Sequence, residues 1–133
     1  MTGVDIVGGL LRAYQPLLTV VPAERIKAGV LPDGVALPAL LVRLVSGVDA
    51  QPLKRTGWER RTHRVSVTVR AAAYRDQAAA IELVRACCAG RTGDIGGAAR
   101  VSILTAGLGP DVDGPANSFE QTQDFRVSFD ALT

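Results

Sequence analysis

The side chains best suited to chemistry in this sequence are one histidine, His63, and two adjacent cysteines, Cys87 and Cys88. An acyl-transfer triad or a histidine metal cluster would have to use His63, but this residue takes an apolar position in an alternating segment. A structural imidazole is far commoner there than a catalytic one. The cysteines fall late in a predicted helix, away from the N-terminal dipole that activates a thiol. We therefore predict no enzymatic activity and interpret both thiols as reduced core residues.

Motifs for ligands are equally weak. The segment Asp111-Val112-Asp113-Gly114 resembles part of a calcium loop, but its glycine is misplaced and the distal glutamate is missing, so we interpret it as a turn. The glycines at 93, 96 and 97, and those at 107 and 109, match neither a phosphate-binding loop nor a dinucleotide fingerprint. Two adjacent cysteines cannot supply a four-ligand zinc site. The sequence thus predicts no cofactor and no metal.

Charge is unevenly distributed along the chain, although the net charge is only +2. Residues 54–75 contain seven basic residues and one acid, whereas residues 111–133 contain five acids and one base. Opposite patches suit copies of the chain that meet head to tail. Alternatively, the two segments are strand faces that pair within one molecule. Trp58, at a loop-to-strand junction, is either an interface anchor or a residue that closes one end of the core.

The clearest structural pattern runs from residue 63 to residue 90. Apolar and polar residues alternate over residues 63–71, which predicts a half-buried strand. Asp76 then caps a predicted helix with an apolar stripe, and Gly90 is placed to end it in a left-handed conformation. A strand followed by a helix that folds back onto it is the smallest unit able to seed a core.

The other predicted elements are an N-terminal helix over residues 4–18 that Pro16 interrupts, a short edge strand over 25–30, and strands over 39–45, 99–106 and 123–131. Residues 39–45 are apolar on both faces, so we expect that strand to be central. Residues 46–57 are predicted to be a hairpin connection, 90–97 a turn and 107–117 a mobile loop. This order predicts one α+β domain over residues 1–133, with a mainly antiparallel sheet of four to five strands and two helices packed on one face.

The composition is that of a globular protein, with 47% apolar and 21% charged residues. No apolar run approaches the ~20 residues needed to span a bilayer, and no secretion signal is recognisable at the N-terminus. We expect a soluble protein that is made in the cytoplasm and does not enter a membrane.

Several segments together give the chain a family resemblance. Residues 23–32, Ala-Glu-Arg-Ile-Lys-Ala-Gly-Val-Leu-Pro, are followed by Leu-Pro-Ala-Leu-Leu-Val at 37–42. With the strand from residue 63, the Ala-rich helix after Tyr74 and the ending Gln-Thr-Gln-Asp-Phe-Arg-Val-Ser-Phe at 121–129, this order resembles the tail-terminator proteins of long-tailed bacteriophages and gene transfer agents. These proteins complete the tail and join it to the head. The resemblance covers nearly the whole chain and consists of spacing and hydrophobic pattern.

The resemblance implies a structural α+β subunit without catalytic residues, which caps the tail tube as a hexameric ring. Its implied partners are other copies of the chain, the tail tube protein and the head connector or stopper, with DNA only passing through the ring. The implied location is the neck of the virion, after assembly in the host cytoplasm. We predict two contact regions, a basic strand and an acidic loop, made by Trp58, Arg60, Arg61, Arg64 and Arg70, and by Asp111, Asp113 and Glu120.

Two alternatives remain open at this point. The first is a head-completion protein, a stopper or adaptor of the same neck. The second is a small nucleic-acid-binding module that uses the arginines of the basic strand for phosphate contacts, although the sequence contains no recognised module of that kind.

Overall fold

Two long antiparallel strands form the centre of the molecule. The computed structural model describes residues 1–132, so Thr133, the last residue of the predicted domain, lies outside the described residues. β3 (Trp58–Ala71) and β7 (Phe119–Leu132) pair along their whole length, from Trp58 opposite Leu132 to Ala71 opposite Phe119. Buried and more exposed residues alternate along most of both strands, as the period of a half-buried strand requires. The strand predicted from residue 63 is therefore confirmed and begins earlier.

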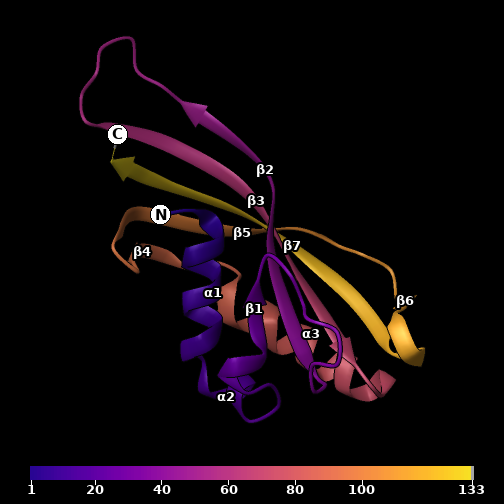
Figure 1. Cartoon of the computed structure of the whole chain (residues 1–133). Coiled ribbons are helices and arrows are strands. Elements are labelled where there is room, and N and C mark those ends of the chain that lie inside the picture. Colours follow the sequence, from indigo (N-terminus) through magenta and orange to yellow (C-terminus); the bar gives the residue numbers. More distant parts are fainter. Residues whose placement is uncertain (133) are drawn as a thin grey trace.

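Shorter strands extend this pair on both sides (Figure 1). The sheet has the order β1-β2-β3-β7-β5-β4, and β6 also pairs with β7. The bounds are Ile26–Ala28 for β1, Ala39–Ala50 for β2, Thr92–Ile95 for β4, Ala98–Leu108 for β5 and Val112–Asp113 for β6. Only β1 and β2 run parallel; the other pairs are antiparallel. The predicted α+β class and the mainly antiparallel sheet are confirmed, but within residues 1–132 the sheet has seven strands rather than four or five.

Three α-helices are present within residues 1–132, instead of the two predicted: α1 (Gly3–Ala13), α2 (Gln15–Leu18) and α3 (Tyr74–Cys88). Thr2 and Asp5 form a capping box at the start of α1. Pro16 lies in the first turn of α2, where a missing N–H costs nothing, so it starts a new helix as well as ending the old one. Gly90 follows α3 with a φ of 79°, the left-handed stop that was predicted. The predicted cap was wrong: α3 begins at Tyr74 with Ala73 at the N-cap position, so Asp76 lies inside the first turn.

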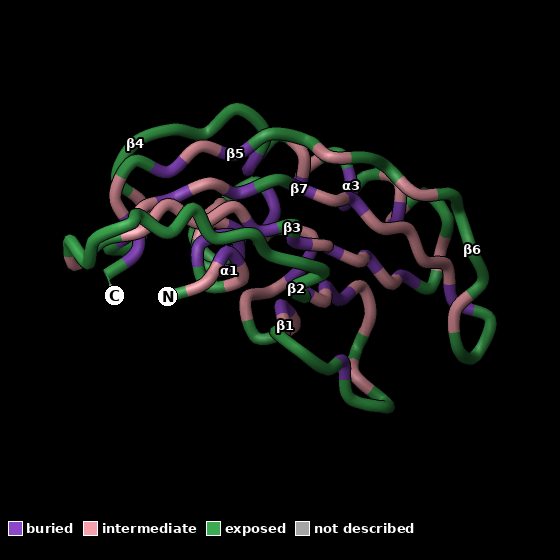
Figure 2. The backbone as a smooth tube through the Cα atoms, turned by 90° about the horizontal axis from the view of Figure 1, so that it is seen from above, coloured by how far each residue is buried: buried purple, intermediate pink, exposed green. Residues whose placement is uncertain are grey.

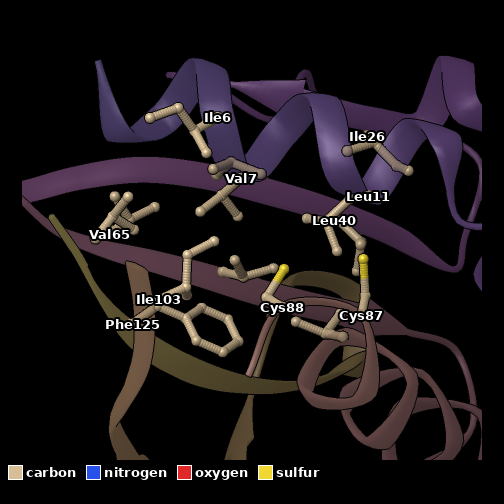
Figure 3. Close-up of a cluster of buried hydrophobic side chains, with 14 of the residues drawn as sticks. Ile6, Val7, Leu11, Ile26, Leu40, Val65, Cys87, Cys88, Ile103 and Phe125 are labelled. Atoms are coloured by element: carbon tan, nitrogen blue, oxygen red, sulfur yellow. The ribbon is translucent and has the colours of Figure 1, made fainter. Parts of the chain in front are cut away.

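Helices α1 and α3 pack against the same face of the sheet, and their apolar side chains share one core with the strands. Figure 3 shows this cluster, with Val7 and Leu11 of α1 on one side and Phe125 and Cys88 on the other. The predicted inward residues of the last strand are all buried: Phe125, Val127, Phe129 and Ala131. No helix in the described part of the chain is long and apolar enough to cross a membrane.

Several predictions about loops and edges were wrong. Residues 39–45 do not form a central strand, because β2 lies next to the edge of the sheet and is exposed from Arg43 onward. Residues 46–50 continue β2, so the connection to β3 is shorter than predicted. The predicted turn at 90–97 contains β4, and the predicted loop at 107–117 contains β6 and the 3₁₀ turn Pro115–Asn117. The short edge strand expected within 25–30 is confirmed as β1.

Candidate functional site

The face of the sheet that points away from α1 and α3, called the open face below, carries most of the predicted contact residues. Strand alternation decides this placement, because Val65, Val67 and Val69 of β3 point into the core. The side chains between them therefore point to the opposite face, and the same holds for alternate residues of β7. One solvated face is usual for an antiparallel sheet.

Polar side chains of β3 pair with polar side chains of β7 at intervals along the open face. Arg60 bonds to Asp130 at 3.1 Å, Arg64 to Asp124 at 2.8 Å, and Arg70 lies 3.5 Å from Glu120. Two hydroxyl pairs lie between these ion pairs: Thr62 with Ser128 at 3.1 Å, and Thr68 with Thr122 at 2.8 Å. Three arginines of the basic segment and three carboxylates of the acidic segment therefore neutralise one another within one molecule, which favours one of the two alternatives for these residues.

This pairing weakens the case for a nucleic-acid-binding module. Three arginines that would contact phosphates, Arg60, Arg64 and Arg70, already face carboxylates of β7. A phosphate would have to displace each carboxylate before the counterion release that drives such binding could be gained. Arg126 is different: it stands opposite Arg64 in the strand register and has no carboxylate partner within residues 1–132.

Exposed apolar side chains gather on the open face toward the end where β2 turns back into β3. Trp58 and Leu132 are direct neighbours across β3 and β7, and Trp58 is 48% exposed while Leu132 is 71% exposed. Val48 of β2 lies at the same end, and Leu104 of β5 lies nearer the middle of the sheet. Trp58 thus does not close the core, and exposed aromatic and aliphatic side chains on one face are typical of a contact surface.

The predicted acidic residues lie at the other end of the same sheet. Asp111 precedes β6, Asp113 lies in β6, and Glu120 pairs with Arg70 near the end of β3. The segment is held in place: Gln77 of α3 donates to Asp111 at 3.1 Å, and the Tyr74 hydroxyl donates to the same carboxylate at 3.2 Å. A groove of about 540 Å³ on the open face runs beside this end, lined in part by Arg43, Arg70, Val112 and Glu120.

The structure therefore separates the two predicted contact regions along the length of the sheet. Arg70 lies twelve residues along an extended strand from Trp58, which corresponds to about 40 Å at about 3.3 Å per residue. Arg61 does not lie on the open face with the other predicted arginines. It is the strand neighbour of Arg60, so its side chain points to the opposite face of the sheet. There it bonds to Glu59 at 2.7 Å and lies 3.7 Å from Asp49.

Some surface residues escaped the sequence analysis. Val48 fell in a predicted loop, so its alternation with β3 was not visible. Leu104 was interpreted as an ordinary residue of the strand predicted over 99–106, because the apolar side of a strand is normally its buried side, and Leu132 lies just beyond the strand predicted over 123–131. A signal was present for Leu104, since it is out of phase with Val101 and Ile103, which are buried.

His63 has a structural role that the sequence could not specify. It is 7% exposed, its Nδ1 accepts a hydrogen bond from the backbone N–H of Gly3 at 3.0 Å, and its ring meets Phe129 edge to face at 5.2 Å. It thereby satisfies one of the free donors at the start of α1. Burial lowers the pKa of His63 from its ordinary value of 6.5; Arg61 and the N-terminus also lower it, and Asp49 opposes them. The geometry needs the neutral ring, because a protonated Nδ1 cannot accept.

We expect acid to destabilise the protein through His63. The unfolded chain takes up the proton first as the pH falls through 6.5, so the free energy of unfolding should decrease from there down to the lower pKa of the folded state. Above pH 6.5 this group should add no pH dependence. Urea unfolding of the wild type and of His63→Asn at pH 7.5 and 5.5 tests this, because asparagine offers a non-titrating acceptor. An equal loss of stability in both proteins would contradict the assignment.

Cys87 and Cys88 are both free thiols buried in the core, as predicted. The hydrogen bond to Cys87 and burial both raise the pKa of Cys88, so this thiol stays protonated. Among residues 1–132, no three His, Cys, Asp or Glu side chains are arranged to hold a metal ion.

Comparison with known proteins adds one finding. Neither a family model nor a curated protein matches the sequence. A solved structure described as the virion of a native gene transfer agent (GTA) particle contains a chain similar to this one, with a TM-score of 0.70. The match covers 97% of this chain and 95% of that chain, at 16% sequence identity. The two chains therefore share one fold over almost their whole length.

Proposed function

We propose that this chain is a non-enzymatic, structural protein of a phage-like particle. The observation that carries the proposal is the fold shared with a chain of a gene transfer agent virion over nearly the full length of both chains. Small virion subunits work by binding their neighbours, and this molecule offers an exposed sheet face and uncovered strand edges. The family resemblance of the sequence supports the same class independently of the fold.

Within the particle, we assign the chain to the neck as a tail terminator. In that role it forms a hexameric ring on the last ring of the tail tube, stops tube growth and offers a surface to the head connector. The spacing of the candidate contact regions supports this role, because Trp58 and the acidic residues Asp111 and Asp113 lie near opposite ends of a long sheet. A ring subunit between tube and connector needs two such ends. DNA passes through the lumen, assembly takes place in the host cytoplasm, and no membrane is involved.

We assign predicted contact residues to the two ends of the sheet. Trp58 and Arg60 belong to one axial contact, together with exposed Leu132. Asp111 and Asp113 belong to the opposite end, where Gln77 fixes the position of the segment. Arg64, Arg70 and Glu120 act by holding the open face in shape through their ion pairs.

The function is tested by removing the gene from the cluster that encodes its particle and examining the products by electron microscopy. If the chain is a tail terminator, the deletion strain should produce tails of uncontrolled length and heads without tails. Restoring the wild-type gene should restore joined particles, whereas Trp58→Ala with Leu132→Ser should fold but restore fewer. Normal particles without the gene would refute the structural role altogether.

Tail length also separates this role from its nearest alternative, a head-completion protein of the same neck. Loss of a head-completion protein leaves tails of normal length beside unjoined heads, since tube growth still stops. A narrow tail-length distribution in the deletion strain would therefore move the assignment to the head side of the joint.

A further inference from the structure

The charges that β3 and β7 place on the open face do not balance. The ion pairs of Arg60, Arg64 and Arg70 use the three carboxylates that these strands carry there, Glu120, Asp124 and Asp130. One further arginine of the same face, Arg126 of β7, is left over. It is exposed near the middle of the β3–β7 pair, and it forms no ion pair within residues 1–132.

Arg126 also lies directly opposite another positive charge. Arg64 is its neighbour in the register of β3 and β7, on the same face. Like charges in directly opposite positions destabilise an antiparallel pair. Arg64 is held by the Asp124 carboxylate and the Ala106 carbonyl oxygen, each at 2.8 Å, so it cannot turn away without losing both bonds. A charge that costs stability and has no partner in the described chain indicates a role other than folding.

A hollow of about 180 Å³ adjoins the two arginines and is called the arginine hollow below. It is lined by Ser46, Val48, Thr62, Arg64, Ala106 and Arg126. Its β2 side belongs to the exposed stretch of residues 43–50 (Figure 2). Guanidinium and hydroxyl groups donate hydrogen bonds, and no carboxylate of the described chain lines the hollow. Such a lining fits an oxyanion, which forms strong charge-assisted bonds with arginine.

The charge of the arginine hollow favours an anion that carries one negative charge. Asp124 already neutralises Arg64, so Arg126 contributes the one uncompensated positive charge. A carboxylate or a phosphodiester matches this charge. A phosphomonoester carries about −1.5 to −2 at pH 7 and would bring an excess of negative charge.

Apolar side chains beside the arginines favour a protein carboxylate over a nucleic-acid phosphodiester. Val48 lines the arginine hollow and is 72% exposed, and Leu104, opposite Arg126 on β5, is 56% exposed. Apolar side chains around an arginine are typical of a protein–protein contact. Nucleic acids are bound through many free cations, whereas the arginines of β3 on this face already have carboxylate partners.

We infer that the arginine hollow binds an aspartate or glutamate side chain of a different protein in the particle. The carboxylate accepts hydrogen bonds from Arg126, whose planar guanidinium can bind both oxygens. Apolar residues next to this acid cover Val48 and Leu104. The inference rests on the proposed function in one respect, that the chain works in contact with other proteins of a particle, and it names one surface and the chemistry of the partner.

A second copy of the chain fits the arginine hollow less well. Its Asp111 carboxylate is held by Gln77 and Tyr74, and Asp113 lies at the end of the sheet that we assign to an axial contact. Two copies that met through their open faces would bring positive charges together, which is unfavourable.

NMR titration of the isotope-labelled protein with acetyl-Val-Glu-Val-amide tests the site. We expect saturable shifts confined to the lining of the arginine hollow, including Ser46 and Arg126, with a Kd of about 1–10 mM for so small a ligand. The uncharged acetyl-Val-Gln-Val-amide should bind roughly tenfold more weakly or less. Arg126→Gln should weaken binding of the glutamate peptide by a similar factor. Arg55→Gln removes the same charge from the exposed loop after β2 and should bind like the wild type.

Three results of this titration would overturn the inference. The first is the absence of saturable shifts at the arginine hollow. The second is tighter binding there of a thymidine oligonucleotide or of inorganic phosphate than of the glutamate peptide. The third is a set of concentration-dependent shifts at the hollow in the protein alone, lost in Arg126→Gln, because these would make a second copy the occupant.

Urea unfolding without ligand separates a binding role of Arg126 from a structural one. Because the opposed arginines cost stability, Arg126→Gln should raise the unfolding midpoint by about 0.1–0.3 M, and Arg55→Gln should leave it unchanged. A lower midpoint for Arg126→Gln would show that Arg126 stabilises the fold and would contradict the inference.

The inference and the proposed function fail in different ways. Peptide binding needs no particles, so a positive titration stands even if particles mature normally without the gene. Conversely, a deletion strain with aberrant tails that Arg126→Gln repairs as fully as the wild type would keep the function and remove this contact.

Discussion

Replacing Phe125 with alanine is expected to lower the free energy of unfolding by about 3–5 kcal/mol, the cost of emptying a well-packed core position. Phe125 is fully buried at the middle of β7 and belongs to the cluster that joins Val65 and Ile103 of the sheet to Cys88 of α3 (Figure 3). The strands and helices around the ring are fixed by their own packing, so the cavity cannot collapse completely. Such a loss is a large part of the 5–15 kcal/mol that stabilises a typical domain.

Urea unfolding of the purified protein measures this effect. Leu132→Ala is the matched control, since Leu132 lies in the same strand but is 71% exposed, and its replacement should change stability by no more than about 0.5 kcal/mol. If Phe125→Ala cost no more than Leu132→Ala, the core would not be organised around β7 as described.

Replacing Gln77 with leucine should cost about 1–2 kcal/mol, the second largest effect we expect. Gln77 is fully buried on α3, and its amide donates to Asp111 at 3.1 Å and to Gln121 at 2.8 Å. Leucine has a volume close to that of glutamine, but it leaves the Asp111 carboxylate and the Gln121 side-chain oxygen without the amide donor of Gln77. The half-buried Gln121 oxygen loses a donor that water replaces only in part, whereas Asp111 is exposed and keeps the Tyr74 hydroxyl; leucine also removes the Gln77 Oε1, a buried oxygen without a partner, which offsets part of the loss.

The same replacement should also loosen the acidic end of the sheet. Hydrogen exchange of residues 109–114 should become faster in Gln77→Leu, whereas exchange in the centre of β3 should change little. Tyr74→Phe is the control, because it removes the other donor to Asp111 from a side chain that is 51% exposed. We expect a smaller loss there, about 1 kcal/mol or less. Equal effects of the two variants would contradict the central role of Gln77.

Local patterns in the sequence determined the elements that have a buried face. The alternation around Val65 and around Val127 predicted β3 and β7, and the spacing of Ala80, Ile81 and Val84 predicted α3. These signals are visible without a structure, because the side-chain period of a strand or helix is set by its own backbone. The α+β class, with the helices on one face, followed from the order of the elements.

The short edge strands and the extent of β2 depended on neighbours. β4 and β6 contain few apolar residues and exist because β5 and β7 offer them hydrogen bonds. The apolar run after Ala39 indicated a central strand, yet β1 covers only residues 40–42, and the rest of β2 is exposed. The local sequence of a strand does not encode how far the neighbouring strand extends along it.

The surface chemistry was decided by tertiary structure for the same reason. Arg64 and Asp124 are 60 residues apart in sequence, as are Gly3 and His63, and only the pairing of β3 with β7 and the docking of α1 bring them together. The sequence determined which residue types were present and which side of each strand they occupied. The fold determined which charges are neutralised within the molecule and which, like Arg43 and Asp113, form no ion pair within residues 1–132, because ion pairing depends on distances that local periodicity does not encode.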